Sequence, residues 1–488
     1  MAKIQVSHLT FAYPGSADVI FDDVSFQVDT DWKLGFIGRN GRGKTTFLRL
    51  LMGSLPNHGA IACSVLFDYF PLSVAAPEKT PLELAEEYIG PEESWRFLRE
   101  FFSLDMEERL LSQPYASLSG GEKTRVLLAL LFAREHRFLL IDEPTNHLDM
   151  AGRRCVSRYL NQKKGFILVS HDRAFLDGCV DHILALNKAN IEVQKGNFSS
   201  WEENKRRQDQ FELEENERLK KDIKKMREAA QRMAQWSDAV EATKIGLGPC
   251  DRGAIGAKAA KMMRHSKAVE TRRARALEEK EGLLKNIEQA EDLKLSSLPH
   301  FSDTLVTFRN VSLAYDRRVI LTGVNFSLHQ GEIAALTGKN GCGKTSVLRL
   351  LNGELSPTGG EIRLASGLRI SYVPQNAALS GPLKGFIEER GLDETLFKAI
   401  LRKLDFSREQ FEKDMSAYSA GQIKKVLIAG SLCQQAHLYV WDEPLNYIDV
   451  MSRMQLERLI ARFRPTMLLV EHDETFLAHI SARIIAFS

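Results

Sequence analysis

The stretch Gly38-Arg39-Asn40-Gly41-Arg42-Gly43-Lys44-Thr45-Thr46 occurs a second time as Gly338-Lys339-Asn340-Gly341-Cys342-Gly343-Lys344-Thr345-Ser346. Both copies fit the pattern G-x-x-x-x-G-K-[ST], in which backbone amides, a lysine and a hydroxyl hold nucleotide phosphates and Mg2+. Glycines let the backbone wrap the phosphates, and the following helix adds the positive end of its dipole. Apolar, β-rich runs precede the loops at residues 32–37 and 332–337, and residues with helical spacing follow them. This order predicts a phosphate-binding α/β fold in each half.

Three further landmarks recur at a spacing close to that of the two glycine loops. They are Leu118–Glu122 with Tyr418–Gln422, Phe138–Pro144 with Leu438–Pro444, and Ser170–Asp172 with Glu471–Asp473. In the second pair an apolar strand ends in two carboxylates, one suited to a metal ion and one to an attacking water. A repeat this regular indicates duplication of one cassette and argues against a chance match of the loops.

Composition excludes several classes of protein. The 488 residues are 44% hydrophobic and 27% charged, which is typical of a globular protein with room for two full cores. No apolar run approaches the length of a membrane helix, and the N-terminus has no apolar signal region. The cysteines are scattered without zinc spacing and indicate free thiols. We therefore expect a cytoplasmic location without membrane attachment.

The middle of the chain, residues 201–300, changes character. Residues 201–236 contain neither Gly nor Pro, and Leu219, Ile223, Met226, Ala230 and Met233 follow a heptad seam. A Gly- and Pro-containing break follows at residues 244–250, and helical composition returns at about residues 257–293. The pattern predicts an antiparallel helical hairpin.

Charge is concentrated on this hairpin. Residues 218–275 contain sixteen Lys/Arg and six Asp/Glu, a local charge of +10 that leaves −8 on the rest of the chain. A basic element between acidic bodies favours a polyanionic partner, because phosphate contacts give affinity that is independent of sequence. A solvated helical face is the alternative reading of the same pattern.

Taken together, the phosphate loops, the Ser-Gly-Gly-Glu sequence, the Asp-Glu pairs and the terminal histidines resemble the ATP-binding cassette (ABC) ATPases over nearly all of both halves. Two cassettes on one chain with a charged helical linker resemble the ABC-F translation factors. Residues 32–43, 253–257 and 441–447 resemble the Lsa-type antibiotic-resistance members. The fold implied is α/β, with two tandem P-loop ATPase domains (1–200 and 303–488) joined by a long antiparallel α-helical hairpin linker (201–302).

The resemblance implies ATP and Mg2+ as ligands of a monomer whose cassettes pair head to tail, each ATP lying between one phosphate loop and the opposite signature. Glu143 and Glu443 are expected to polarise water, with His171 and His472 at the γ-phosphate; a surface carboxylate is the alternative reading of Glu143. Contacts to ATP are expected from Tyr13, Gly38, Asn40, Gly41, Gly43, Lys44, Thr45, Thr46, Ser119, Gly120, Gly121, Tyr315, Gly338, Asn340, Gly341, Gly343, Lys344, Thr345, Ser346, Gln375, Ser419 and Gly421. Ligands of Mg2+ are expected to be Thr45, Asp142, Thr345, Gln375 and Asp442. Tyr13 and Tyr315 could stack on adenine or be core aromatics.

The two halves differ at positions that matter to this chemistry. Gln375, in Tyr372-Val373-Pro374-Gln375, has Leu72 as its counterpart in the first half, and the second signature has Ala420 and Gln422 in place of Gly and Glu. With head-to-tail pairing these departures fall in one composite site. The sequence therefore predicts unequal sites with faster turnover at Glu443, although equal hydrolysis stays open because both halves keep Lys, Asp, Glu and His.

In the resembling family the linker enters the ribosomal exit site, contacts P-site tRNA and reaches towards the peptidyl-transferase centre. The resemblance thus implies a bacterial 70S ribosome (23S rRNA and P-site tRNA) as partner of residues 218–275, and protection against lincosamides, pleuromutilins and streptogramin A. The hairpin loop is shorter than the Lsa pattern, so no drug-displacing residue is carried over. A housekeeping translation factor acting on P-site tRNA is the alternative. A transporter ATPase subunit or a DNA-maintenance ATPase fits less well, because both cassettes are complete and the linker joins them.

Overall fold

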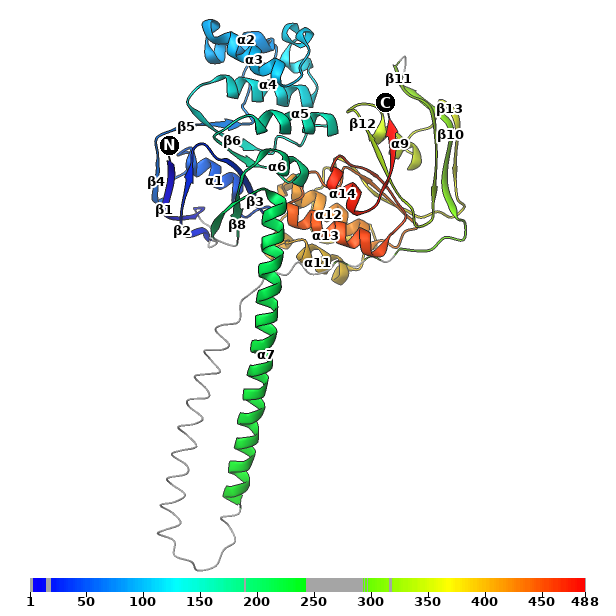
Figure 1. The fold of residues 1–488 in the computed structure, drawn as a ribbon. Helices are drawn as coiled ribbons and strands as arrows, with labels where there is room; N and C mark the ends of the chain where they lie inside the picture. The colour runs from blue at the N-terminus through cyan, green and yellow to red at the C-terminus, as the bar shows by residue number, and fades with distance from the viewer. Residues whose placement is uncertain are drawn as a thin grey trace, which may run out of the picture. The chain divides into compact units, whose positions relative to one another are not determined.

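A computed structural model describes residues 3–14, 19–187, 190–242, 293, 295, 297–315 and 318–487 (Figure 1). The described chain falls into two compact units. One unit holds both halves of the repeat, residues 1–201 and 290–488, and the other holds residues 202–289. The described residues do not include the predicted break at residues 244–250 or most of the predicted return arm. They also do not include the side chains of Met226 and the later seam residues.

The first half contains two sheets. An antiparallel sheet has the order β2-β1-β4, and a larger sheet has the order β5-β6-β7-β3-β8-β9, parallel except for the β8–β9 pair. The strands are β1 (Lys3–Ala12), β2 (Val19–Asp29), β3 (Lys33–Gly38), β4 (His58–Cys63), β5 (Leu66–Phe70), β6 (Arg137–Asp142), β7 (Phe166–Val169), β8 (His182–Leu186) and β9 (Ile191–Lys195). Strand β7 is buried at every position and β3 and β6 at all but their ends, as expected for parallel strands covered on both faces.

The second half repeats this plan. Its antiparallel sheet has the order β11-β10-β13 and its parallel sheet the order β14-β15-β16-β12-β17. The strands are β10 (Thr304–Tyr315), β11 (Arg318–His329), β12 (Ile333–Gly338), β13 (Gly359–Leu364), β14 (Ile370–Val373), β15 (Leu438–Asp442), β16 (Met467–Val470) and β17 (Arg483–Phe487). Strands β6 and β15 both end at the aspartate of an Asp-Glu pair, which places these carboxylates at the carboxyl edge of each sheet.

Helices carry the remaining motifs. Those of the first half are α1 (Lys44–Leu51), α2 (Pro81–Ile89), α3 (Ser94–Ser103), α4 (Gly120–Ala133), α5 (Met150–Asn161) and α6 (Arg173–Cys179), with short 3-10 turns η1 (Pro91–Glu93), η2 (Glu108–Ser112) and η3 (Tyr115–Ser117). Those of the second half are α9 (Lys344–Leu351), α10 (Leu383–Glu389), α11 (Glu394–Lys403), α12 (Ala420–Cys433), α13 (Val450–Phe463) and α14 (Glu474–His479), with η4 (Glu409–Glu412) and η5 (Met415–Ala417). Helices α1 and α9 begin at the loop lysines.

The first arm of the predicted hairpin is one continuous helix, α7 (Phe198–Ala242), drawn in green in Figure 1. Its 45 residues span about 68 Å at roughly 1.5 Å per residue. Phe198 and Trp201 are buried in the core of the first half and fix the start of the helix there. Among the described residues, no helix combines the length and the apolar character needed to cross a membrane.

Candidate ATP sites

Each phosphate loop contains a position that only glycine can occupy. Gly43 and Gly343 precede α1 and α9 with φ of 103° and 95°, in the left-handed region that favours glycine. A Cβ on Gly43 would lie 2.4 Å from the Ile20 side chain, and one on Gly343 would lie 2.7 Å from Leu321. The backbone can therefore bend this tightly only because these positions lack a side chain.

The loop lysines lie folded over their own loops. Lys44 Nζ donates to Gly38 O at 2.7 Å and Arg39 O at 3.2 Å, and Lys344 Nζ donates to Gly338 O and Lys339 O at 2.9 Å. Both lysines are buried, and burial lowers the pKa of Lys44. Each loop thus holds a buried ammonium group, which attracts an anion more strongly than an ammonium group in water does.

The aspartates that end β6 and β15 lie beside the loop hydroxyls. Thr45 Oγ1 donates to Asp142 Oδ2 at 2.8 Å, and Tyr69 OH donates to the same oxygen at 3.0 Å. Asp442 is fully buried, and neither of its carboxylate oxygens accepts a well-formed hydrogen bond from the described residues. Burial raises its pKa to about 6 against the opposing effect of the Thr345 hydroxyl. A buried carboxylate next to a hydroxyl fits Mg2+, a hard cation that takes oxygen ligands.

The two glutamates after these aspartates adopt a strained backbone. Glu143 and Glu443 have φ of 51° and 44°, values that few residues other than glycine adopt. Such strain persists where the surroundings enforce it, and it is concentrated at functional sites. Both side chains point into the protein, being 20% and 14% exposed, so the surface reading of Glu143 does not describe its position.

The surroundings of the two glutamates differ. Glu443 Oε2 accepts a hydrogen bond from Gln375 Nε2 at 2.7 Å and another from Asn446 Nδ2, while His472 Nε2 is 4.0 Å from Glu443 Oε1. His171 Nε2 is 3.1 Å from Glu143 Oε1, and burial raises the pKa of Glu143 to about 8. Burial and the nearby loop lysines lower the pKa of both histidines, that of His472 to about 3, so both rings are neutral near pH 7.

Leu72, the counterpart of Gln375, packs against the core of the first half. Its apolar side chain offers no donor to Glu143, so Leu72 cannot make the contact that the Gln375 amide makes with Glu443.

The signature serines act as helix caps. Ser119 Oγ accepts from Glu122 N while Glu122 Oε2 accepts from Ser119 N, and Ser419 with Gln422 makes the same reciprocal contacts. Gln422 therefore replaces the glutamate of the first signature without loss of the cap.

The phosphate loops also contact the opposite half. Asn40 Nδ2 donates to Tyr447 O at 2.6 Å, and Asn340 Nδ2 donates to His147 O at 3.1 Å. A Cβ on Gly421 would lie 3.2 Å from Asn40 Nδ2, so the second signature lies against the first phosphate loop. Gly120 and Gly121 pack against His147 of their own half.

The adenine-side candidates are accessible. Tyr13 is 39% exposed and Tyr315 is 42% exposed, which fits a stacking surface better than a core position. Tyr13 OH lies 2.9 Å from Thr46 Oγ1, so this ring is held at the start of α1.

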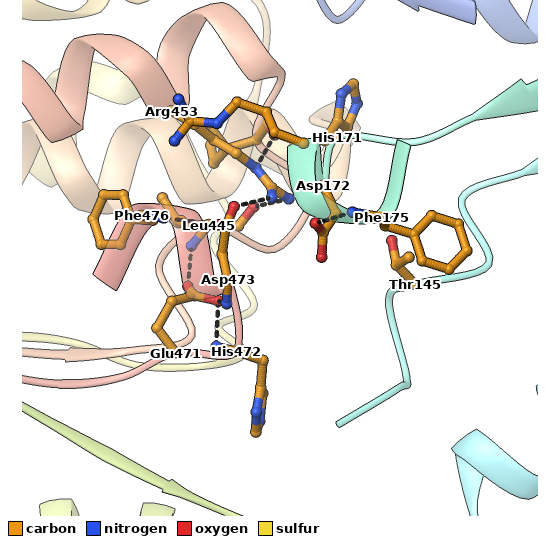
Figure 2. Close-up of polar contacts among 12 residues, drawn as sticks. Thr145, His171, Asp172, Phe175, Leu445, Arg453, Glu471, His472, Asp473 and Phe476 are labelled. Atoms are coloured by element: carbon orange, nitrogen blue, oxygen red, sulfur yellow. Dashed lines mark hydrogen bonds and ion pairs between the residues drawn. The ribbon is translucent and has the colours of Figure 1, made fainter. Parts of the chain in front are cut away.

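Sequence reasoning missed two buried arginines, Arg153 and Arg453, each paired with the aspartate that follows a site histidine; Figure 2 shows Arg453 near Asp473. Arg153 Nη1 pairs with Asp172 Oδ2 at 2.8 Å, and Arg453 Nη1 pairs with Asp473 Oδ2 at 3.3 Å. Both aspartates also cap the next helix, accepting from Phe175 N and Phe476 N at 2.9 Å. Each arginine therefore ties the helix after an Asp-Glu pair to the loop that carries a histidine. The repeat spacing of Arg153 and Arg453 was the signal that could have found them.

The chain belongs to the ABC transporter family, whose model matches residues 21–146 and 321–446, more than half of the chain. It is an ABC-type ATPase. The relatives that it resembles over nearly its whole length are, more particularly, ABC-F proteins.

Two relatives illustrate this similarity. The chain is 28% identical to the ribosome protection protein VmlR of Bacillus subtilis (strain 168), over 96% of this chain and 83% of VmlR. It is 26% identical to the energy-dependent translational throttle protein EttA of Mycobacterium tuberculosis, over 96% of this chain and 88% of EttA.

Among solved structures, the chain resembles that of an archaeal ribosome recycling factor, aABCE1, determined in complex with the stalk protein aP1. The TM-score is 0.64 at 19% identity, and the match covers 99% of this chain and 87% of that chain. At this identity the likeness shows the fold alone.

Proposed function

We propose that this ATPase binds the bacterial ribosome in its ATP state and leaves after hydrolysis. The observation that carries the proposal is the extent of the similarity to VmlR and EttA, which spans both cassettes and the segment between them. VmlR is named for ribosome protection and EttA for the throttling of translation. A transporter subunit has no evident use for a helix as long as α7 between two complete cassettes.

A cluster of exposed lysines on α7 supports an RNA partner. Lys220, Lys221, Lys224 and Lys225 are exposed, whereas Ile223 between them is buried. Around Ile223 the helix thus presents four exposed lysines (220, 221, 224 and 225), called here its basic face. RNA is recognised largely through its shape and backbone, and lysines add affinity by releasing counterions from phosphates. The basic face is proposed to contact 23S rRNA and P-site tRNA, within a linker of residues 201–302 between cassettes of residues 1–200 and 303–488.

The chemistry at each site is proposed to be in-line attack of water on the γ-phosphate. Glu143 and Glu443 orient and polarise the water, and the loop lysines balance phosphate charge. Neutral His171 and His472 donate to a γ-phosphate oxygen. Mg2+ held by Thr45 with Asp142, or by Thr345 with Asp442 and Gln375, would neutralise charge on the β- and γ-phosphates.

ATP is proposed to add further contacts between the two halves to those that Asn40 and Asn340 make. Asn40 and Asn340 already join each phosphate loop to the loop after the opposite Asp-Glu pair. Phosphates at these loops would add the N-termini of α4 and α12 as further partners. Closure of a single chain in this way requires no second copy, so the protein is proposed to act as a monomer in the cytoplasm.

Co-sedimentation with ribosomes tests the proposal. The Glu143→Gln/Glu443→Gln protein, which should bind ATP without splitting it, is expected to pellet with 70S ribosomes in ATP but not in ADP. Retention on duplex DNA in ATP, without retention on ribosomes, would contradict the proposal and favour DNA maintenance. Flotation with membranes would favour the transporter reading.

Protection of ribosomes against peptidyl-transferase-centre drugs is the finer proposal, and the similarity to VmlR supports it. Expression in a susceptible bacterium should raise the inhibitory concentration of lincosamides, pleuromutilins or streptogramin A. The double glutamate variant is the control and should give no protection. Unchanged sensitivity together with ribosome binding in ATP would favour the second candidate, a housekeeping factor acting on P-site tRNA, which the similarity to EttA supports.

A further inference from the structure

A buried lysine lies behind the second ATP site. Lys424 belongs to α12, five residues after the signature serine, and is only 3% exposed. Its Nζ donates to Pro374 O at 3.0 Å, Gln375 O at 3.1 Å and Asp442 O at 3.1 Å. An ammonium group has three N–H donors, so these carbonyls use its full capacity.

The carbonyls bound by Lys424 lie just beyond the end of a strand pairing. The parallel pairing of β14 with β15 ends at Val373 opposite Trp441. The segments beyond Val373 and Trp441 no longer pair as strands, and carbonyl oxygens of both accept hydrogen bonds from the same ammonium group of Lys424. One segment then presents the Gln375 side chain and the other presents Glu443, and these two side chains meet at 2.7 Å.

The first half has no such lysine. The position that matches Lys424 in the repeat is Thr124. Threonine carries its hydroxyl on Cβ, whereas lysine carries its ammonium group at the end of a four-carbon chain, so the threonine side chain is much shorter. The position that matches Gln375 is Leu72. The lysine and the glutamine thus occur together in one half and are replaced together in the other.

Burial lowers the pKa of Lys424 to about 8, although Asp442 and Glu443 oppose this effect. A buried ammonium group is costly unless its donors are satisfied. A position that served only to fill the core would be occupied more favourably by an apolar side chain.

We propose that Lys424 is a positioning residue of the second ATP site, which fixes the backbone around Gln375 against the end of β15 so that the Gln375 amide stays on Glu443. The inference rests on the proposed role of Glu443 in orienting water. Lys424 touches neither nucleotide nor water in this role and acts through Gln375.

The experiment measures single-turnover ATP hydrolysis without ribosomes in a Glu143→Gln background, where only the second site is active. Lys424→Met is expected to slow hydrolysis about tenfold, with ATP affinity within about threefold, because a hydrogen-bonded charged group is lost from the support of Gln375 and not from the phosphate loop. In a Glu443→Gln background, where only the first site is active, Lys424→Met should change the rate less than about twofold.

A double-mutant cycle separates positioning from general damage. If Lys424 acts through Gln375, Lys424→Met should slow a Gln375→Leu protein by no more than about twofold. If the double variant loses rate by the product of the Lys424→Met and Gln375→Leu losses, the proposal is overturned. Equal rate losses on Lys424→Met in the two glutamate backgrounds would also overturn it. If Lys424→Met does not fold, Lys424→Thr, which introduces the residue of the first half, replaces it in the same assays with the same expected outcomes. Failure of Glu443→Gln to abolish hydrolysis at the second site would instead reject the proposed role of Glu443, independently of Lys424.

Discussion

Replacing Gln375 by leucine would give the second site the residue of the first. The bond from Gln375 Nε2 to the carboxylate of Glu443 is 2.7 Å long, and the carboxylate is 14% exposed, so solvent screens it weakly. A hydrogen bond to a charged group contributes about 1.5–3 kcal/mol. Glu443 keeps its contact with Asn446, so the loss should fall at the lower end of that range. Since ~1.4 kcal/mol is a factor of ten in rate, loss of this hydrogen bond alone should slow hydrolysis at the second site about tenfold, and loss of the proposed Mg2+ contact of Gln375 would add to that effect.

The assay is rapid-quench measurement of one ATP turnover in the Glu143→Gln background. The matched control is the same Gln375→Leu change in the Glu443→Gln background, where the first site alone works and the rate should not change. Before that substitution, the Glu143→Gln protein should hydrolyse faster than the Glu443→Gln protein. Equal rates in the two backgrounds, or a Gln375→Leu rate equal to that of its parent, would refute the reasoning that the sites are unequal.

Three further outcomes follow from the geometry. Gly43→Ala should abolish ATP binding at the first site in an equilibrium titration, because its Cβ would lie 2.4 Å from a β2 side chain at a φ of 103°, whereas Gly385→Ala, with open space around it, should bind ATP normally. Arg453→Met should lower the stability in thermal denaturation by about 3 kcal/mol, since it leaves a buried carboxylate unpaired; a loss below about 0.5 kcal/mol would contradict this. Glu143 has a pKa of about 8 in the folded chain against 4.5 when exposed, so nucleotide-free stability falls as pH rises through that window. The melting temperature of Glu143→Gln relative to the parent should therefore be higher at about pH 8 than at about pH 5, and a constant difference would count against it.

Much of the architecture could be predicted because it depends on local patterns. The glycine loops fix a strand–loop–helix turn through backbone conformation alone, and the caps of Ser119 and Ser419 depend on residues three positions away. The heptad seam and the absence of Gly and Pro in residues 201–236 predicted a helix there, and the structure has α7 in that segment.

Other features could not be predicted from local pattern. Lys424 meets carbonyls about 50 and 18 residues away in the chain, and such contacts arise only when strands and helices are packed together. Gln422 looked like a departure in the sequence, yet its amide oxygen caps the helix as Glu122 does, because the cap requires an acceptor and not a charge. The domain boundaries and the residue roles at the sites remain predictions.

The central claim is that the basic face of α7 contacts ribosomal RNA, and the salt dependence of binding tests it most directly. Lysines 220, 221, 224 and 225 should be changed together to glutamine in the Glu143→Gln/Glu443→Gln protein. The control changes Lys384, which is exposed, and Lys398, which is partly exposed, on the second cassette. Each phosphate contact adds about 0.7–0.9 to the slope of log K against log salt. We predict a slope reduced by about 3, with weaker binding at low salt, for the α7 variant alone. An unchanged slope and affinity in that variant would contradict the account.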